Sequence, residues 1–130
     1  MFYGIVESES LHNPRVLNTL TAKKVVKEFQ PNAETKYWHI FVLKVSDDEI
    51  VSVAEDIASE IKNGWYAIFW SGAKVYVVFS RKIFELRKEA HWQSAEYEAV
   101  REYGNKNGVQ KEYLDFNKNF AQYHKLTEDK

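Results

Sequence analysis

The stretch NGWYAIFWSGAKVYVVFSRKIFEL, Asn63–Leu86, is the segment around which the fold is built. Aromatic and β-branched residues, which favour strands, run through it and are interrupted only at turn-forming positions. The pattern predicts a strand from Trp65, a tight turn at Ser71-Gly72, a second strand, and a short third strand after Arg81-Lys82. The first two strands therefore form an antiparallel hairpin.

A further strand is predicted immediately upstream, over Tyr37–Val45. Both alternating sets of its side chains are largely apolar, which is typical of a strand covered on both faces. We therefore place this strand near the centre of the sheet.

An amphipathic helix is predicted between these two strands. Ser46-Asp47-Asp48-Glu49 has the sequence of a capping box, and Asn63-Gly64 supplies a left-handed stop. The apolar residues in between recur at helical spacing: Ile50, Val53, Ala54, Ile57 and Ile61. A right-handed crossover through this helix would leave the Tyr37 and Trp65 strands parallel in one sheet, so the sheet is expected to be mixed.

The N-terminal third adds two strands and a helical turn. Phe2–Val6 is a short apolar run, and Ala22–Phe29 carries lysines between its valines, as guarded edge strands do. Asn13-Pro14 resembles a helix start with proline in the first position.

The C-terminal part predicts a second helix over Ala90–Tyr103, ended by Gly104. Its expected apolar face consists of Trp92, Ala95, Ala99, Val100 and Tyr103. Glu112–Phe116 forms a turn, and Phe116, Phe120 and Tyr123 keep a helical spacing that would dock a short C-terminal segment. Leu126–Lys130 is expected to fray. We therefore divide the chain into a single domain over 1–116 and an extension over 117–130.

Composition excludes several classes of protein. The 130 residues contain 45% apolar and 28% charged side chains, as ordinary globular domains do, with a formal charge of −1. The absence of cysteine removes disulfides, thiolate nucleophiles and iron–sulfur clusters. The N-terminus lacks the basic leader of a signal peptide, and no window is apolar enough to span a membrane. The expected location is the cytoplasm.

No motif in the sequence assigns a reaction, a cofactor or a metal. The four histidines, His12, His39, His91 and His124, are too far apart to place two ligands on one helical face. Phosphate-binding loops, nucleophile elbows and calcium loops are missing from the sequence. Asp47, Asp48 and Glu49 are explained by helix capping, and Asp115 by anchoring backbone amides.

Basic residues beside aromatic strands raise the alternative of single-stranded nucleic-acid binding. Arg81-Lys82 and Arg87-Lys88 form this cluster. The net negative charge argues against it, and so does the tendency of aromatic residues in covered strands to be core.

Two helices are too few to cover both faces of a five- or six-stranded sheet, so some aromatic surface is expected to remain. Such surface is common at subunit interfaces and in ligand clefts. The candidate ligand or interface surface consists of His39, Trp65, Tyr66, Trp70, Tyr76 and Arg81.

The segments Gly64–Trp70, Val75–Leu86 and Glu98–Phe116 resemble a family of small, uncharacterised prokaryotic proteins. The shared features are a Gly-Trp-Tyr-Ala hairpin, a Val-Phe-x-x-Lys-x-Phe strand and a closing Leu-Asp-Phe segment. Val109-Gln110 departs from the Ile-Pro typical of that turn. The resemblance implies one compact domain and no known activity.

The sequence thus predicts an α+β domain with a mixed, mostly antiparallel sheet and two main helices, close in element order to a ferredoxin-like sandwich. The leading hypothesis is a non-enzymatic module that binds a protein partner or a small ligand and forms a homodimer through aromatic sheet surface. The alternative is an enzyme of unknown reaction with a cleft near His39, Trp65 and Arg81, with Glu85 nearby. Fold alone does not choose between them.

Overall fold

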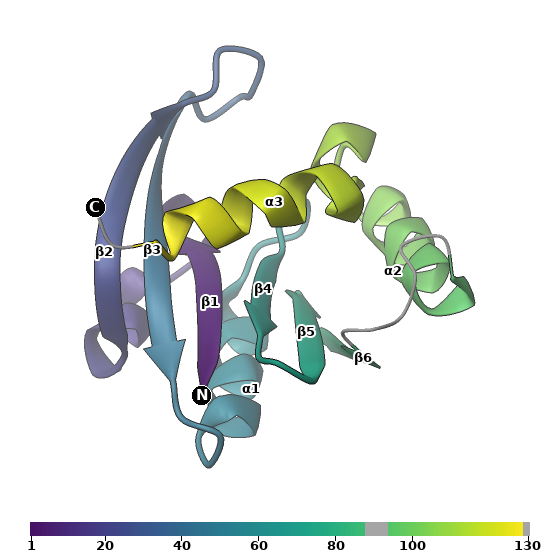
Figure 1. The fold of residues 1–130 in the computed structure, drawn as a ribbon. Coiled ribbons are helices and arrows are strands. Elements are labelled where there is room, and N and C mark those ends of the chain that lie inside the picture. The colour runs from purple at the N-terminus through teal and green to yellow at the C-terminus, as the bar shows by residue number, and fades with distance from the viewer. Residues whose placement is uncertain (88–93, 129–130) are drawn as a thin grey trace.

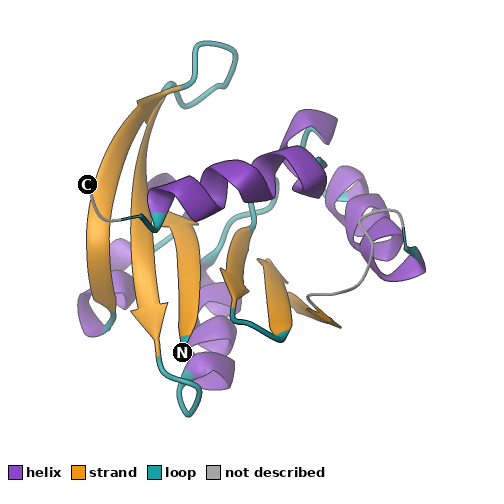
Figure 2. Cartoon of the chain, in the orientation of Figure 1, coloured by secondary structure: helices purple, strands orange, loops and turns teal. Residues whose placement is uncertain are grey.

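The computed structural model describes residues 1–87 and 94–128, which form an α+β fold around one six-stranded sheet (Figures 1 and 2). The strand order is β2-β3-β1-β4-β5-β6. The strands are β1 (Phe2–Glu7), β2 (Thr21–Phe29), β3 (Tyr37–Val45), β4 (Ala67–Trp70), β5 (Lys74–Phe79) and β6 (Lys82–Arg87). The α-helices are α1 (Ile50–Glu60), α2 (Ala95–Lys106) and α3 (Phe116–Leu126), and the short 3-10 helices are η1 (Ser8–Ser10), η2 (Pro14–Thr19) and η3 (Lys111–Leu114).

Most of the predicted elements are present. The strand over Tyr37–Val45 lies between two neighbours, the Ala22–Phe29 strand is at the sheet edge, and Ser71–Lys74 closes the hairpin between β4 and β5. The first strand of that hairpin begins at Ala67 rather than at Trp65. The predicted turn after Asn13 is η2, where the Asn13 side chain accepts a hydrogen bond from the Arg15 amide.

The prediction of a mixed sheet is wrong. β1 lies between β3 and β4 and pairs antiparallel with both, so β3 and β4 run parallel, as expected, but are not paired with each other. Each hydrogen-bonded strand pair in the described residues is antiparallel. The physical reason is the insertion of the N-terminal strand into the space left by the crossover.

Helix α1 covers one face of the sheet. Its predicted apolar residues, including Val53, Ala54 and Ile57, are buried against Val6, Leu43 and Phe69. The predicted capping box is not formed: the helix begins at Ile50, and the Ser46 hydroxyl donates to the Glu49 carboxylate, 2.9 Å away, instead of capping an amide. The helix also ends at Glu60, before Gly64, whose φ of +88° serves the following turn.

Helices α2 and α3 cover the opposite face (Figure 1). The apolar face predicted for the second helix is only partly correct. Val100 is buried and Tyr103 packs against the core, as predicted, but Ala95 and Ala99 are exposed, and Tyr97, which was not predicted, is buried. Gly104 does not end the helix but lies buried inside it against Leu114. The predicted start at Ala90 and the predicted core residue Trp92 lie outside the described residues.

Helix α3 is the element that the sequence analysis underestimated. Instead of a short docked segment, it is an 11-residue helix whose Phe116 and Phe120 are buried in the same core as Ile5, Ile68 and Trp70. The Asp115 carboxylate accepts a hydrogen bond from the Lys118 backbone amide, 3.3 Å away, as the predicted anchor of backbone amides, and it thereby caps α3. The predicted boundary at residue 116 coincides with the first residue of α3.

Candidate ligand-binding site

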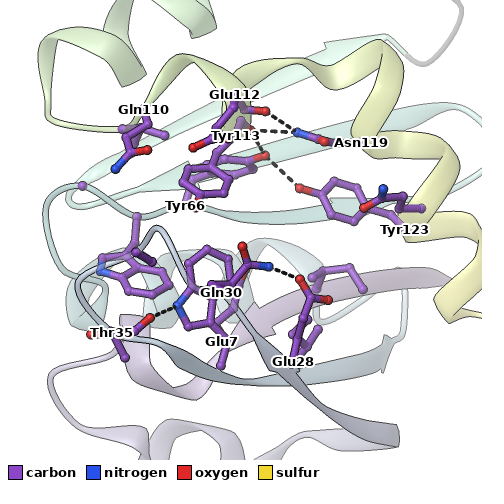
Figure 3. Close-up of a pocket in the computed structure, with 18 of the residues that line it drawn as sticks. Glu7, Glu28, Gln30, Thr35, Tyr66, Gln110, Glu112, Tyr113, Asn119 and Tyr123 are labelled. Atoms are coloured by element: carbon purple, nitrogen blue, oxygen red, sulfur yellow. Dashed lines mark hydrogen bonds between the residues drawn. The ribbon is translucent and has the colours of Figure 1, made fainter.

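A pocket of about 500 Å³ opens between the sheet face under α3 and the loop that joins β2 to β3. Figure 3 shows two walls: Tyr66, Tyr113, Asn119 and Tyr123 on one side, and Glu7, Glu28 and Gln30 on the other. The volume lies within the range of small-molecule sites in proteins.

Glu7 lies in the wall of this pocket at the end of β1. Tyr3, Ile5 and Glu7 alternate along the strand and so face α3 together, because successive strand residues point to opposite sides. Part of the residue reaches solvent, but its Oε2 atom is buried and has no hydrogen-bond partner within the described ranges. A buried polar atom in a native fold is normally paired, so this oxygen is an exception that needs an explanation.

Burial raises the pKa of the Glu7 carboxyl from its ordinary value of 4.5 to about 8. A backbone hydrogen bond within Glu7 opposes the rise, and the charges of Glu28 and Glu9 add to it. At neutral pH the group is therefore mostly the neutral acid.

A chain of hydrogen bonds joins the opposite wall. The Tyr66 hydroxyl donates to the Tyr113 carbonyl. The hydroxyl oxygens of Tyr66 and Tyr123 lie 2.8 Å apart. The Asn119 amide donates to the carbonyls of Glu112 and Tyr113, each at 3.2 Å. Burial raises the pKa of the Tyr66 and Tyr123 phenols, so both stay protonated near neutral pH.

Aromatic rings form the remaining side of the pocket. Trp38 lies between Trp65 and Tyr113, with ring centroids 5.0 and 5.4 Å away. The Trp38 indole N–H donates to the Thr35 carbonyl, 2.8 Å away, which fixes the ring against the β2–β3 loop. All three rings are partly exposed.

The six residues predicted as a candidate surface do not come together. Trp65 and Tyr66 line the pocket. Tyr66, Trp70 and Tyr76 are buried, because α3 covers Trp70 with Phe120 and Tyr123, while Phe2 packs against Tyr76. They therefore belong to the core of the chain rather than to an exposed aromatic sheet surface.

His39 and Arg81 are outside the described lining of the pocket. His39 alternates with Trp38 and Ile40, so its side chain is on the other face of β3. There its Nδ1 lies 2.6 Å from Oε2 of Glu9, whose Oε1 accepts from the His39 amide. These two hydrogen bonds lower the pKa of Glu9, although burial acts in the opposite direction and is the largest single influence.

Arg81 forms the turn between β5 and β6, with a φ of +60°, and its amide donates to the Ala58 carbonyl, 3.0 Å away. Glu85 accepts a hydrogen bond from the Tyr76 hydroxyl, 2.9 Å away. In the predicted basic cluster, Arg87 pairs with Glu96 at 2.6 Å, and Lys88 lies outside the described residues.

Glu7 is the site residue that the sequence analysis missed. The sequence analysis ends the first apolar run at Val6 and assigns no role to the glutamate that follows. The available signal was its alternation with Tyr3 and Ile5, which places a carboxylate on a face that also carries large apolar residues.

No family model matches the chain, and searches of curated proteins and of solved structures also return no match. The resemblance to the small prokaryotic family stays a prediction. Within residues 1–87 and 94–128, no group of three or more histidine, aspartate or glutamate side chains is arranged to hold a metal ion. No helix of the described chain has the length and apolar character needed to cross a membrane.

Proposed function

We propose that this α+β protein is a non-enzymatic module that binds a small organic ligand in the pocket between β1, β3 and α3. The observation that carries the proposal is the buried Oε2 of Glu7, which has no hydrogen-bond partner among the described residues, in the wall of a cavity of about 500 Å³. Leaving a buried polar group unpaired costs free energy, and a ligand that pairs with the Glu7 carboxyl group, after a side-chain rotation exposes this oxygen, would recover that cost.

A fragment screen by protein NMR tests this function. Two neighbouring exposed residues of α3 provide matched variants, because Gln122 lines the pocket and Ala121 is outside its described lining. Compounds that bind should perturb amides around Glu7 and Tyr113. Binding should be lost in Gln122→Trp, which fills the pocket mouth, and retained in Ala121→Trp. A screen in which no compound of any charge perturbs these amides would overturn the proposal.

An acid–base enzyme is the second candidate, and the raised pKa of Glu7 favours it. A carboxyl group that titrates near pH 8 can exchange protons at physiological pH. Mass spectrometry of compounds recovered after incubation separates the two functions. A compound converted by the wild type and left intact by Glu7→Gln would indicate an enzyme, whereas compounds returned unchanged fit the binding module.

We also propose that the protein self-associates, through the outer face of β2 and β3. Val25, Phe29 and Tyr37 share this face and are 50%, 54% and 52% exposed, and the rings of Phe29 and Tyr37 lie 5.2 Å apart. An exposed apolar patch on an edge strand is typical of an interface. Light scattering at micromolar concentration should show a dimer that Phe29→Ser weakens; a wild-type monomer would refute it.

We also propose a ferredoxin-like arrangement, by analogy with the order of the elements, and a location in the cytoplasm. Single-stranded nucleic-acid binding is the remaining alternative, and it predicts a salt-sensitive mobility shift of an oligonucleotide. The burial of Trp70 and Tyr76 disfavours it, since stacking requires accessible rings.

A further inference from the structure

The charge of the pocket limits which ligands it can hold. Its described lining contains four carboxyl side chains and a single basic one, that of Lys118. The four acidic residues are Glu7, Glu28, Glu34 and Glu112. Backbone carbonyls of Glu112 and Tyr113 turn toward the Asn119 side chain at the same wall. An anionic ligand would meet repulsion here, and a cation would meet attraction.

The aromatic side of the pocket favours the same kind of ligand. Trp38, Trp65 and Tyr113 are partly exposed, and the Trp38 ring is tilted against the other two with interplanar angles of 57° and 53°. The face of an aromatic ring carries negative partial charge, so it attracts ammonium and guanidinium groups as well as apolar groups. Such rings beside a carboxylate make a surface suited to an organic cation.

We propose that the pocket binds an organic cation, a primary ammonium or guanidinium group on an apolar body, with the Glu7 carboxylate as its counter-ion. This inference rests on the proposed function and specifies its ligand class. The cationic N–H would donate to the Glu7 carboxylate once a side-chain rotation turns Oε2, which is buried and has no partner in the described structure, toward the pocket. The apolar body would lie against Trp38, Trp65 and Tyr113.

Binding of the cation would release one proton, because Glu7 must become negatively charged to pair with it. Before a ligand binds, Glu7 is mostly protonated below about pH 8. When the cation enters, the carboxyl loses its proton to solvent and an ion pair forms in its place. The charged and titratable groups that face or surround Glu7 are Glu9 in η1, Glu28 in β2, Glu34 in the β2–β3 loop, Tyr66 before β4, Glu112 and Tyr113 in η3, and Lys118 and Tyr123 in α3.

Titration calorimetry with three probes of one shape but different charge tests the inference. Phenethylamine is the cation, phenethyl alcohol its neutral analogue and phenylacetate the anion. At pH 7 the wild type should bind the amine at least about tenfold more tightly than the alcohol. Amine affinity should rise by up to about tenfold per pH unit below pH 8, because one proton is released per ligand.

Glu7→Gln keeps the size and shape of the side chain and removes the charge. This variant should bind amine and alcohol within about threefold of each other and should lose the pH dependence. Glu55→Gln is the matched control, since Glu55 is exposed on α1, the helix that covers the opposite face of the sheet. It should retain the wild-type preference. A cooperative thermal transition of Glu7→Gln confirms that the variant is folded.

The outcomes separate this inference from the proposed function. Tighter binding of alcohol or phenylacetate than of amine, with NMR changes around Glu7, would overturn the cationic ligand class and leave the pocket as a binding site. An amine preference that survives in Glu7→Gln would also overturn the inference. If none of the three probes and no compound of the wider screen binds in the pocket, both the cationic ligand class and the proposed binding function would be refuted.

Discussion

The hydroxyl oxygens of Tyr66 and Tyr123 lie 2.8 Å apart and join the sheet to α3 at the back of the pocket. Tyr66 has a single hydroxyl proton, which it donates to the Tyr113 carbonyl, so Tyr123 must be the donor between the two phenols. Tyr66 is thus the central member of the chain, and Tyr123 is its end.

This order predicts unequal costs for removing the two hydroxyls. Tyr66→Phe takes away both hydrogen bonds and leaves the Tyr123 hydroxyl unpaired, so we expect a loss of about 1–3 kcal/mol in the free energy of unfolding. Tyr123→Phe takes away only one bond and should cost about 0.5–1.5 kcal/mol. Urea unfolding measures both values. A larger loss for Tyr123→Phe would contradict the direction of the chain.

Glu7 should make the protein less stable as the pH rises. Its pKa in the fold, about 8, is above its ordinary value of 4.5, so between these values the folded state holds a proton that the unfolded state has lost. The free energy of unfolding should therefore fall from about pH 4.5 to about pH 8 and level off above. The total contribution is on the order of a few kcal/mol. Urea unfolding at several pH values should show a flatter profile for Glu7→Gln, and an unchanged profile would refute the raised pKa.

Glu9 should have the opposite effect. Its pKa is lowered in the fold by its hydrogen bonds to His39, so its stabilisation is present above its ordinary pKa of 4.5 and is lost as the pH falls through the lowered value. We expect Glu9→Ala to lose more stability at pH 7 than at pH 3. Equal losses at the two pH values would show that the carboxylate charge is not the stabilising feature.

Gly4 should tolerate no side chain. It pairs with Phe69 across β1 and β4, and a Cβ atom at this position would come within 2.3 Å of Cδ1 in the buried Phe69 ring. Gly4→Ala should cost about 1–3 kcal/mol through overpacking. Thermal or urea unfolding measures the loss. The matched control is Gly72→Ala, where an added Cβ has no atom within 4 Å among the described residues, and it should be nearly neutral.

A double variant checks that the clash with Phe69 is the cause. Gly4→Ala combined with Phe69→Leu should be more stable than the sum of the two single losses predicts, because the smaller side chain leaves room for the methyl group. If the losses of the two single variants simply add in the double variant, the strain in Gly4→Ala comes from a contact other than Phe69.

Local patterns were enough to predict the strands and the first helix. The alternation of Tyr37–Val45, the helical spacing of Ile50, Val53 and Ile57, and the Ser71-Gly72 turn are each encoded by neighbours in the chain, since they depend on strand and helix periods alone. The same alternation along Tyr3, Ile5 and Glu7 was the local sign of the Glu7 side of the site, while Trp65 and Tyr66 were named from their strand pattern.

The sheet order and the pocket depend on contacts between distant segments. β1 separates β3 from β4 because it pairs with both, and no residue within β1 specifies those partners by itself. Helix α3 makes the pocket by placing Tyr123 against Tyr66, 57 positions away, and by burying the surface that was expected to stay open. The sequence by itself thus determined the strands, helix α1 and the buried face of that helix, which are set by period and turn chemistry. Only the tertiary structure decided that Glu7 would lie in a cavity, because desolvation of a carboxylate arises from segments that meet after folding.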